Sequence, residues 1–341
     1  MDSYLNLVSI ILPLYRSERH IRATLMSVLA QTHENWELVV VDDGSPDDSA
    51  AICRAMGDER LRIFRRRNTG SCRARNFGIT EARGEFIAFI DHDDTWLPDK
   101  LAKHLAHLRR RPAVGVSYGP SAFMDVEGRP LGLFQVPRLA DIDAREIICR
   151  CPIGNGSVPL IRREVLEEVR FSEYRDGVPE DMYFDDDAVG WEDVELWFRI
   201  AWRTKWTFEG IPDCLTWYRI VPDGIAGNAE KKQMGFDRGL ERARRYAPEF
   251  IARHGGAARA YHLRYLARRL IHARNGAAAR SYMRRALSSF PGMLLEEPGR
   301  TLVTLCGAYA LGLLPRPIYD WVQAKAIERT GRYQRAQVRG L

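Results

Sequence analysis

Residues 85–94 read EFIAFIDHDD, an apolar run that ends in three aspartates and one histidine. Two earlier runs follow the same plan. LVSIIL at 7–12 ends at Pro13, and WELVVV at 36–41 ends at an Asp-Asp-Gly-Ser sequence. Short apolar runs that are rich in β-branched residues and bounded by polar clusters are typical of buried strands. Each run therefore predicts a strand that carries polar side chains at its carboxyl end.

The segments between these runs have helical spacing. Apolar residues recur every three or four positions in Ile21–Thr32, and Asp47–Met56 and Ser71–Ala82 are also predicted to be helical. For the second of these helices we expect Ser45 or Asp47 as the N-cap. A further short strand is predicted at 61–64. Strands that alternate with helices predict βαβ units and a mainly parallel sheet, in which ligands bind outside the carboxyl ends of the strands.

The rest of the chain gives weaker signals. We expect a helix at 99–111, a strand at 114–118, an irregular segment at 120–160, a short helix at 162–169, an acidic loop at 171–190, a helix at 191–202, two or three Arg-rich helices at 231–286 and an uncharged apolar run at 302–314. The order of these elements predicts an α/β fold with an α-helical C-terminal extension.

The composition is that of a soluble globular protein. The chain has 341 residues, of which 45% are hydrophobic and 28% charged, which excludes wholesale disorder and a polytopic membrane protein. None of the six cysteines forms a CxxC pair, so we expect neither a disulfide framework nor a zinc ribbon. The first residues show no signal-peptide pattern, and we expect a cytoplasmic protein.

Charge is distributed unevenly along the chain. Residues 1–230 contain 29 Lys and Arg against 38 Asp and Glu, whereas residues 231–341 contain 22 against 7. Two explanations stay open for the basic region. It is either an amphipathic helical bundle packed on the rest of the chain, or a surface that docks peripherally on the anionic inner face of the cell membrane. The run at 302–314 is shorter than the about 20 apolar residues that span a bilayer.

Acidic residues at the strand ends are candidate ligands. Asp91 and Asp93 offer hard oxygens at a spacing that suits Mg²⁺ or Mn²⁺, with Asp94 as an additional candidate. Asp42 and Asp43 follow another strand, where a carboxylate can accept a hydrogen bond from a nucleotide base. Turn formation and helix capping explain such aspartates equally well, so these residues alone do not decide between the two readings.

A second acidic pair, Glu192-Asp193, opens a predicted helix. The helix dipole favours an ionised carboxylate at this position, which suits a general base at neutral pH. Ordinary helix capping is the alternative explanation.

The motifs together resemble the nucleotide-sugar domain of family 2 glycosyltransferases, which have the GT-A fold. The resemblance rests on VSIILPLYR, QTHENWELVVVDDGSPDDS and NTGSCRARNFGITEARGEFIAFIDHDD, and continues through Asp99-Lys100, VPLIRREVLEE, Trp191-Glu192-Asp193 and Trp217-Tyr218-Arg219. It covers roughly residues 5–220. The implied domains are a GT-A catalytic domain at 1–225, with a Rossmann-like, mainly parallel sheet, and a basic helical region at 226–341.

The resemblance also implies roles for single residues. Pro13, Tyr15, Asp43 and Arg75 would bind the nucleotide base, and Asp91 would touch the ribose or the metal. Asp93 would ligate Mn²⁺ or Mg²⁺, and Asp193 would be the catalytic base.

The implied reaction is an inverting transfer of one sugar from a nucleotide-sugar donor, a UDP-hexose or UDP-N-acetylhexosamine, to a glycan or lipid-linked acceptor in bacterial surface polysaccharide synthesis. Three features depart from the family pattern. The loop at 180–190 is longer than usual before Glu192-Asp193. The QxxRW motif of processive members is absent, which predicts non-processive transfer, and Ile220 stands where many members have a His that contacts the diphosphate, so Arg219 is the candidate substitute. Residues 185–187 are expected in a solvated, acceptor-side loop, with competition for a metal as the alternative.

Other functions fit the sequence less well. A sugar-1-phosphate nucleotidyltransferase normally has a Gly-rich loop after the first strand, and LPLYRSERH contains no glycine. A dinucleotide-binding dehydrogenase lacks its GxGxxG motif here. A non-catalytic nucleotide-sugar-binding protein is a further alternative, but the chain keeps Asp43, Asp91, Asp93 and Asp193 together. No nucleic-acid-binding motif accompanies the basic region, so no nucleic-acid partner is expected.

Overall fold

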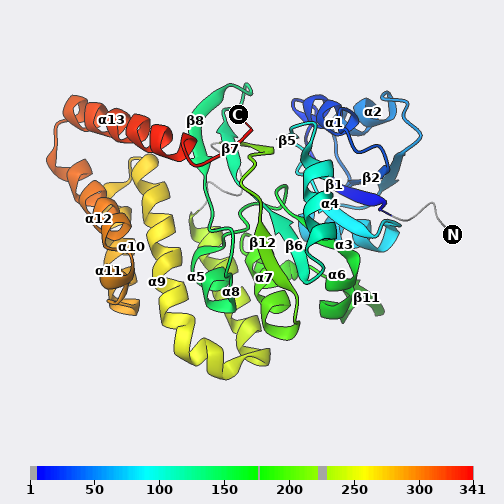
Figure 1. The fold of residues 1–341 in the computed structure, drawn as a ribbon. Helices are drawn as coiled ribbons and strands as arrows, with labels where there is room; N and C mark the ends of the chain where they lie inside the picture. Colours follow the sequence, from blue (N-terminus) through cyan, green and yellow to red (C-terminus); the bar gives the residue numbers. More distant parts are fainter. Residues whose placement is uncertain (1–5, 176, 222–228, 341) are drawn as a thin grey trace.

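The computed structural model describes residues 6–175, 177–221 and 229–340 (Figure 1). Within these ranges the central sheet has seven strands in the order β12-β6-β9-β4-β1-β2-β3. Their bounds are β1 Val8–Leu14, β2 Trp36–Asp42, β3 Leu61–Arg65, β4 Phe86–Phe89, β6 Val114–Tyr118, β9 Leu160–Arg162 and β12 Thr207–Gly210. β9 runs antiparallel to both of its neighbours, and the other pairs are parallel. The expected mainly parallel α/β sheet is confirmed.

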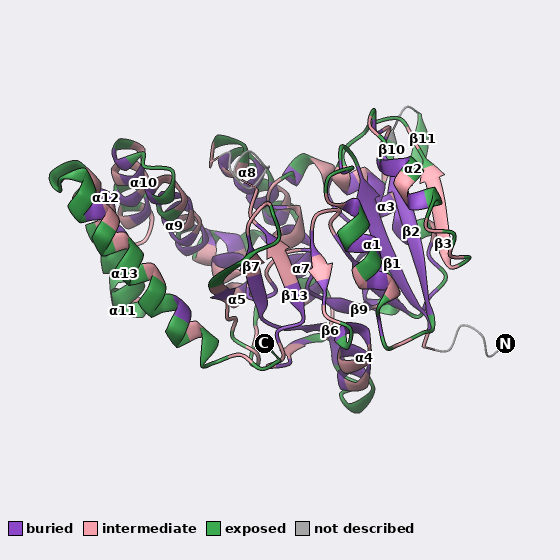
Figure 2. Ribbon diagram, turned by 90° about the horizontal axis from the view of Figure 1, so that it is seen from above, coloured by how far each residue is buried: buried purple, intermediate pink, exposed green. Residues whose placement is uncertain are grey.

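Helices cover both faces of this sheet. One face packs against α1 (Ile21–Leu29), α2 (Ser49–Arg54) and α4 (Lys100–Arg110), and the other packs against α3 (Ser71–Glu81), α6 (Arg163–Val169) and α7 (Glu192–Arg203). Side chains alternate along β1, so that Ile10 and Leu12 enter the first core and Ile11 the second. Figure 2 shows the sheet as the most buried part of the fold. Burial on both faces explains why these strands are continuous apolar runs.

The expected N-cap of α2 is wrong. The helix begins at Ser49, and its N-cap is Asp48 without a side-chain capping bond. Asp47 Oδ1 instead accepts hydrogen bonds from the hydroxyls of Ser45 and Ser49. Both predicted caps therefore stabilise the turn that precedes the helix.

The expectation of an irregular segment at 120–160 is also wrong. It contains β7 (Ser121–Met124), β8 (Pro130–Gln135) and α5 (Ala144–Arg150). Together with β5 (Thr95–Trp96) and β13 (Thr216–Arg219), the two strands form a second sheet in the order β5-β13-β7-β8. Half of the residues of β8 are exposed and it contains a glycine, so it depends on its pairing with β7 to form a strand.

The acidic loop at 171–190 is more ordered than expected. Residues Phe171–Arg175 and Val178–Met182 form the antiparallel hairpin β10–β11, and a 3₁₀ turn follows at Asp186–Ala188. Asp185 is 2% exposed and pairs with Arg242, while Asp186 pairs with Arg73 at 2.8 Å. Two of the three aspartates are therefore held by arginines, which corrects the expectation of a solvated loop.

The C-terminal helices extend the molecule to one side of the sheet (Figure 1). They are α8 Ala229–Tyr246, α9 Pro248–His272, α10 Gly276–Ser289, α11 Met293–Glu296, α12 Pro298–Leu313 and α13 Arg316–Arg335. Phe236, Leu240 and Tyr261 belong to the same hydrophobic cluster as the α7 face of the sheet. The end of α13 returns to the second sheet, where Gln334 Oε1 accepts a hydrogen bond from Phe134 N–H at 3.1 Å.

Candidate functional site

Three predicted site residues follow three neighbouring strands. Tyr15 comes directly after β1, Asp43 directly after β2 and Asp91 two residues after the end of β4, and β1 lies between the other two strands. Pro13 is buried within β1, opposite Val41 of β2. Tyr15 is 37% exposed. The parallel sheet thus gathers these residues at one edge, where ligands of such sheets bind.

Asp43 anchors the loop that leads into α3. Its carboxylate accepts hydrogen bonds from the backbone N–H groups of Thr69 at 2.9 Å and Gly70 at 2.8 Å. Gly70 has a φ of +97°, a conformation that favours glycine. The neighbouring Asp42 is fully buried, and its Oδ1 accepts a hydrogen bond from Ser45 N–H at 2.8 Å. Asp43 therefore lies at the carboxyl end of β2, whereas Asp42 stabilises the turn that follows this strand.

The acidic segment Asp91–Asp94 is fixed from two sides. The hydroxyl of Ser157 accepts a hydrogen bond from Asp91 N–H at 2.9 Å, and Asp94 Oδ1 accepts one from Arg219 N–H at 2.9 Å. Both Ser157 and Asp94 are fully buried. Burial raises the pKa of Asp94, and the nearby carboxylates of Asp93 and Asp91 raise it further. The geometry makes Asp94 a structural residue of this segment.

The side chain of Arg219 also holds the segment Asp91–Asp94 in place through hydrogen bonds. Nε donates to the carbonyl of Asp93 at 2.8 Å, and Nη1 donates to the carbonyls of Asp125 at 3.0 Å and Val126 at 3.1 Å. These bonds connect the acidic segment to the turn between β7 and β8. The suggested contact of Arg219 with a diphosphate stays a prediction.

Arg75 forms ion pairs with two acidic residues of the site, Asp91 after β4 and Glu192 at the start of α7. Its Nη2 lies 2.7 Å from Asp91 Oδ1 and its Nη1 lies 3.4 Å from Glu192 Oε1. Arg75 is 5% exposed, and although burial opposes its charge, the carboxylates of Asp91, Asp193 and Glu192 raise its pKa. The nucleotide-binding role that the resemblance implied for Arg75 stays a prediction, and the contacts place its guanidinium between the acidic segment and α7.

Asp193 lies in the first turn of α7 beside this guanidinium. In the described part of the chain its Oδ1 is buried without a hydrogen-bond partner. Burial raises the pKa of Asp193 to about 7; Arg75 opposes the rise, and Glu192 and Asp91 add to it. The helix dipole alone therefore does not set its ionisation. A carboxylate with a pKa near the working pH is suited to accept a proton.

Asp93 is the predicted metal ligand. Burial raises its pKa and Asp91 adds to the rise, an electrostatic condition that a bound divalent cation relieves. Among the described residues no group of three or more His, Cys, Asp or Glu side chains is arranged to hold a metal ion. Mg²⁺ sites with one or two carboxylates complete their coordination with substrate phosphates and water. The donor set at Asp93 fits a site of that kind.

Sequence reasoning missed three residues of the site. Ser157 follows a Gly-Asn-Gly turn, which was the only sign of its position. Asn76 fixes residues 183–184 through hydrogen bonds with their backbone groups, and its place in the Ala-Arg-Asn motif could have drawn attention to it. Lys232 of α8 lowers the pKa of Asp193, and nothing in the sequence connects these two residues.

Comparisons with known proteins identify the family of this chain. The sequence profile of glycosyl transferase family 2 matches residues 9–170. The "Putative teichuronic acid biosynthesis glycosyltransferase TuaG" of Bacillus subtilis is 30% identical over 249 residues, which cover 71% of this chain and 91% of TuaG. The Escherichia coli "UDP-Glc:alpha-D-GlcNAc-diphosphoundecaprenol beta-1,3-glucosyltransferase WfgD" is 35% identical over 163 residues, which cover 48% of this chain and 62% of WfgD.

Solved structures share the fold. The mannosyltransferase PcManGT from Pyrobaculum calidifontis, in complex with GDP-Man and Mn²⁺, aligns with a TM-score of 0.55 and 21% identity over 96% of this chain and 86% of its own. A fragment of S. aureus TarS in complex with UDP-GlcNAc aligns with a TM-score of 0.50 and 18% identity over 98% and 93%. The family match also sets aside the nucleotidyltransferase alternative. The chain belongs to glycosyltransferase family 2 and is a glycosyltransferase with the GT-A fold.

Proposed function

We propose that the protein transfers one hexosyl or N-acetylhexosaminyl unit from a UDP-sugar to a hydroxyl of a lipid-linked glycan, with inversion at the anomeric carbon. The observation that carries the proposal is the position of Asp193. Its carboxylate, whose buried Oδ1 has no hydrogen-bond partner among the described residues and whose pKa is about 7, lies beside the Arg75 guanidinium that also pairs with Asp91. A proton acceptor thus stands next to the edge of the sheet where Tyr15 and Asp43 would hold the nucleotide.

The proposed reaction is a single displacement at the anomeric carbon, with no covalent sugar–enzyme intermediate. The acceptor hydroxyl gives its proton to Asp193, and its oxygen forms a bond to the anomeric carbon. The bond from that carbon to the β-phosphate oxygen breaks, and the nucleoside diphosphate leaves on the opposite face. Arg75 keeps Asp193 partly ionised and orients Asp91.

A divalent cation, Mn²⁺ or Mg²⁺, would be held by Asp93, with Asp91 beside it. When bound, it would neutralise the charge that develops on the departing diphosphate. The raised pKa of Asp93 supports this part of the proposal.

Named relatives support the donor and acceptor classes. WfgD carries UDP-Glc as donor and a diphosphoundecaprenol-linked sugar as acceptor in its name, and its product linkage is β. The name of TuaG refers to teichuronic acid, a polysaccharide. The absence of the QxxRW motif in this sequence supports transfer of a single sugar per encounter.

The proposal extends to the location and to the domain division of the chain. We propose a cytoplasmic enzyme that works at the inner face of the membrane, because a lipid-linked acceptor is held there. Residues 1–225 would be the catalytic domain and residues 226–341 the basic helical region. Lys232 lies close enough to Asp193 to lower its pKa, so the helical region also contributes charge to the site.

Transfer to a synthetic acceptor tests the proposal. UDP-glucose, UDP-galactose and UDP-N-acetylglucosamine are offered with an alkyl-diphospho-N-acetylglucosamine acceptor and Mn²⁺, and product is measured by mass spectrometry and its linkage by NMR. We expect a β-linked disaccharide from one donor. Asp193→Asn should bind that donor normally and transfer at least about a hundredfold more slowly. An α-linked product, or a wild-type rate in Asp193→Asn, would refute the mechanism.

A further inference from the structure

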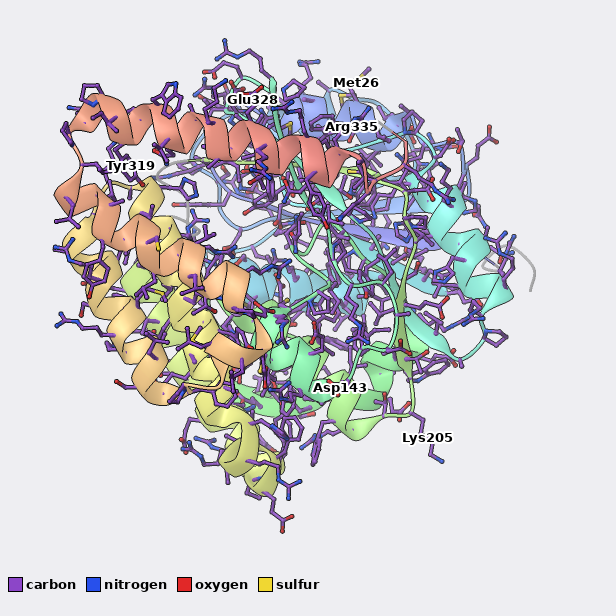
Figure 3. All side chains as sticks on the ribbon, turned by 60° about the vertical axis from the view of Figure 1, so that its left-hand side comes forward. Met26, Asp143, Lys205, Tyr319, Glu328 and Arg335 are labelled. Atoms are coloured by element: carbon purple, nitrogen blue, oxygen red, sulfur yellow. The ribbon has the colours of Figure 1, made fainter. Side chains whose placement is uncertain are left out.

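The helices α12 and α13 form the outer edge of the molecule, on the side away from the central sheet (Figure 2). They are joined by a short connection at Leu314-Pro315. Figure 3 brings this edge to the front. Their inner sides are held by buried residues, among them Thr301, Thr304 and Ala308 of α12 and Tyr319 of α13. The opposite sides are exposed, and their composition is unusual.

The exposed side of this edge is apolar. No charged residue occurs between Arg300 and Arg316. The large apolar side chains that face outward recur at helical spacing on both sides of the connection. They are Leu302 (49% exposed), Val303 (74%), Tyr309 (43%), Leu313 (78%), Leu314 (39%), Ile318 (50%), Trp321 (65%) and Val322 (44%). We call these eight residues the apolar edge. Exposed apolar side chains gathered in this way mark interaction sites.

Basic residues flank the apolar edge. The side chains of Arg300 and Arg332 are 70% and 75% exposed, and Arg316 and Arg329 are exposed as well. From residue 298 to the last residue the sequence has seven Lys and Arg against two acidic residues. Both acidic residues are paired, Asp320 with Arg274 at 2.7 Å and Glu328 with Lys325 at 3.3 Å. The stretch that contains the apolar edge therefore carries a net charge of +5, although Arg300 lies 4.0 Å from Glu297 of the preceding segment.

We propose that the apolar edge docks on the surface of an anionic phospholipid bilayer, with α12 and the start of α13 lying in the interface. Charge complementarity identifies the partner. Basic residues beside an apolar face match negative headgroups above acyl chains, and Trp and Tyr favour that depth. A second copy of the chain is a worse partner, because a symmetric contact would bring two positive rims together.

The helices lie on the bilayer and do not cross it. Over the ranges that the structure describes, no helix is both long and apolar enough to span a membrane. This inference deepens the membrane location given in the proposed function and rests on it for that location, but its test is separate, since binding to vesicles requires neither donor nor acceptor. If correct, it places the enzyme on the surface in which a lipid-linked acceptor is embedded.

Vesicle co-sedimentation of the full chain tests the inference. The probes are vesicles of phosphatidylcholine with 30% phosphatidylglycerol and vesicles of phosphatidylcholine alone. The test variant is Val303→Asp/Leu313→Asp/Trp321→Asp. The matched control is Met26→Asp/Tyr174→Asp, which changes side chains that are 55% and 79% exposed on other elements. Circular dichroism and UDP binding show whether each variant is folded with an intact donor site.

We expect wild type and control to bind the anionic vesicles and the triple variant to bind at least about tenfold more weakly, since it loses three inserted apolar side chains. A second variant, Arg300→Gln/Arg316→Gln/Arg329→Gln, should lose the preference for anionic vesicles. Equal binding by the folded triple variant would overturn the proposal, as would absence of wild-type binding. A dimer in sedimentation velocity that only the triple variant abolishes would assign the edge to self-association instead.

Discussion

Replacing Arg75 by Gln should raise the pKa of Asp193. The distance between the Arg75 guanidinium and the Asp193 carboxylate has an upper limit, because both groups lie near Gly156. A Cβ atom at Gly156 would lie 3.7 Å from Arg75 Nη2 and 3.8 Å from Asp193 Oδ1. The two charged groups are therefore no more than about 7.5 Å apart, the sum of those distances. At that separation and an effective dielectric constant of about 20, a pair of unit charges interacts by about 2 kcal/mol, or roughly 1.6 pKa units.

The titration can be followed without donor or acceptor. Protein labelled with ¹³C at the aspartate carboxyls is titrated from pH 4 to 10, and the Asp193 signal is assigned by its loss in Asp193→Asn. Wild type should titrate near pH 7. Arg75→Gln should titrate near pH 8 to 9, because the guanidinium that favours the ionised form is gone. Arg75→Lys keeps the charge and should stay near 7.

Arg73→Gln is the matched control. It lies on the same helix but pairs with Asp186, so it should leave the midpoint unchanged. Breaking a buried ion pair also destabilises a protein, and thermal unfolding must show that Arg75→Gln is folded at the measuring temperature. A folded Arg75→Gln protein with an Asp193 midpoint still near 7 would refute the electrostatic account of the site.

Four further outcomes are expected. Lys232→Gln should raise the Asp193 midpoint by less than Arg75→Gln does, because Lys232 is the weaker of the two cationic influences; a larger shift would contradict this order. Wild type should lose stability relative to Asp193→Asn as the pH rises from about 4 to 7, since the folded protein disfavours the ionised form, and chemical unfolding at pH 5 and pH 8 measures the difference. Arg199→Met should lower the free energy of unfolding by about 3–5 kcal/mol in urea, because it leaves the carboxylate of Glu195, 1% exposed, without its partner at 2.9 Å; a loss below 1 kcal/mol would show that the pair is dispensable. Ser157→Ala should cost about 1–3 kcal/mol by leaving Asp91 N–H without its acceptor, and unchanged stability would mean that water replaces the hydroxyl.

The central strands could be predicted from sequence almost to the residue. β1, β2 and β4 are buried on both faces, and such strands appear as short, continuous apolar runs whose length and β-branched residues distinguish them from a buried helix. β8 could not be predicted, because half of its residues are exposed and it depends on its pairing with β7 and its contact with Gln334, about 200 positions along the chain. The cap of α5 was missed, although Asp143 precedes Glu146 by three residues and accepts its N–H.

The site was predictable to the extent that strand ends define it. Asp43 and Asp91 lie at the edge where parallel strands bring them, as expected. The partners of Arg75 could not be predicted, because Asp91 and Glu192 lie 16 and 117 positions away and only the packing of α3 against the sheet brings the three together. The raised pKa of Asp193 and the burial of Asp185 could not be predicted either. Both result from burial, which depends on the whole fold.

Titration calorimetry with UDP tests the central claim most directly. UDP is titrated into wild type with and without Mn²⁺, with GDP and dTDP as controls, and then into Asp93→Ala. The account predicts UDP binding that Mn²⁺ strengthens in wild type and does not strengthen in Asp93→Ala, whose fold should be intact. Failure of every nucleotide to bind wild type, or equal strengthening by Mn²⁺ in Asp93→Ala, would contradict a metal-assisted nucleotide-sugar site at this edge of the sheet.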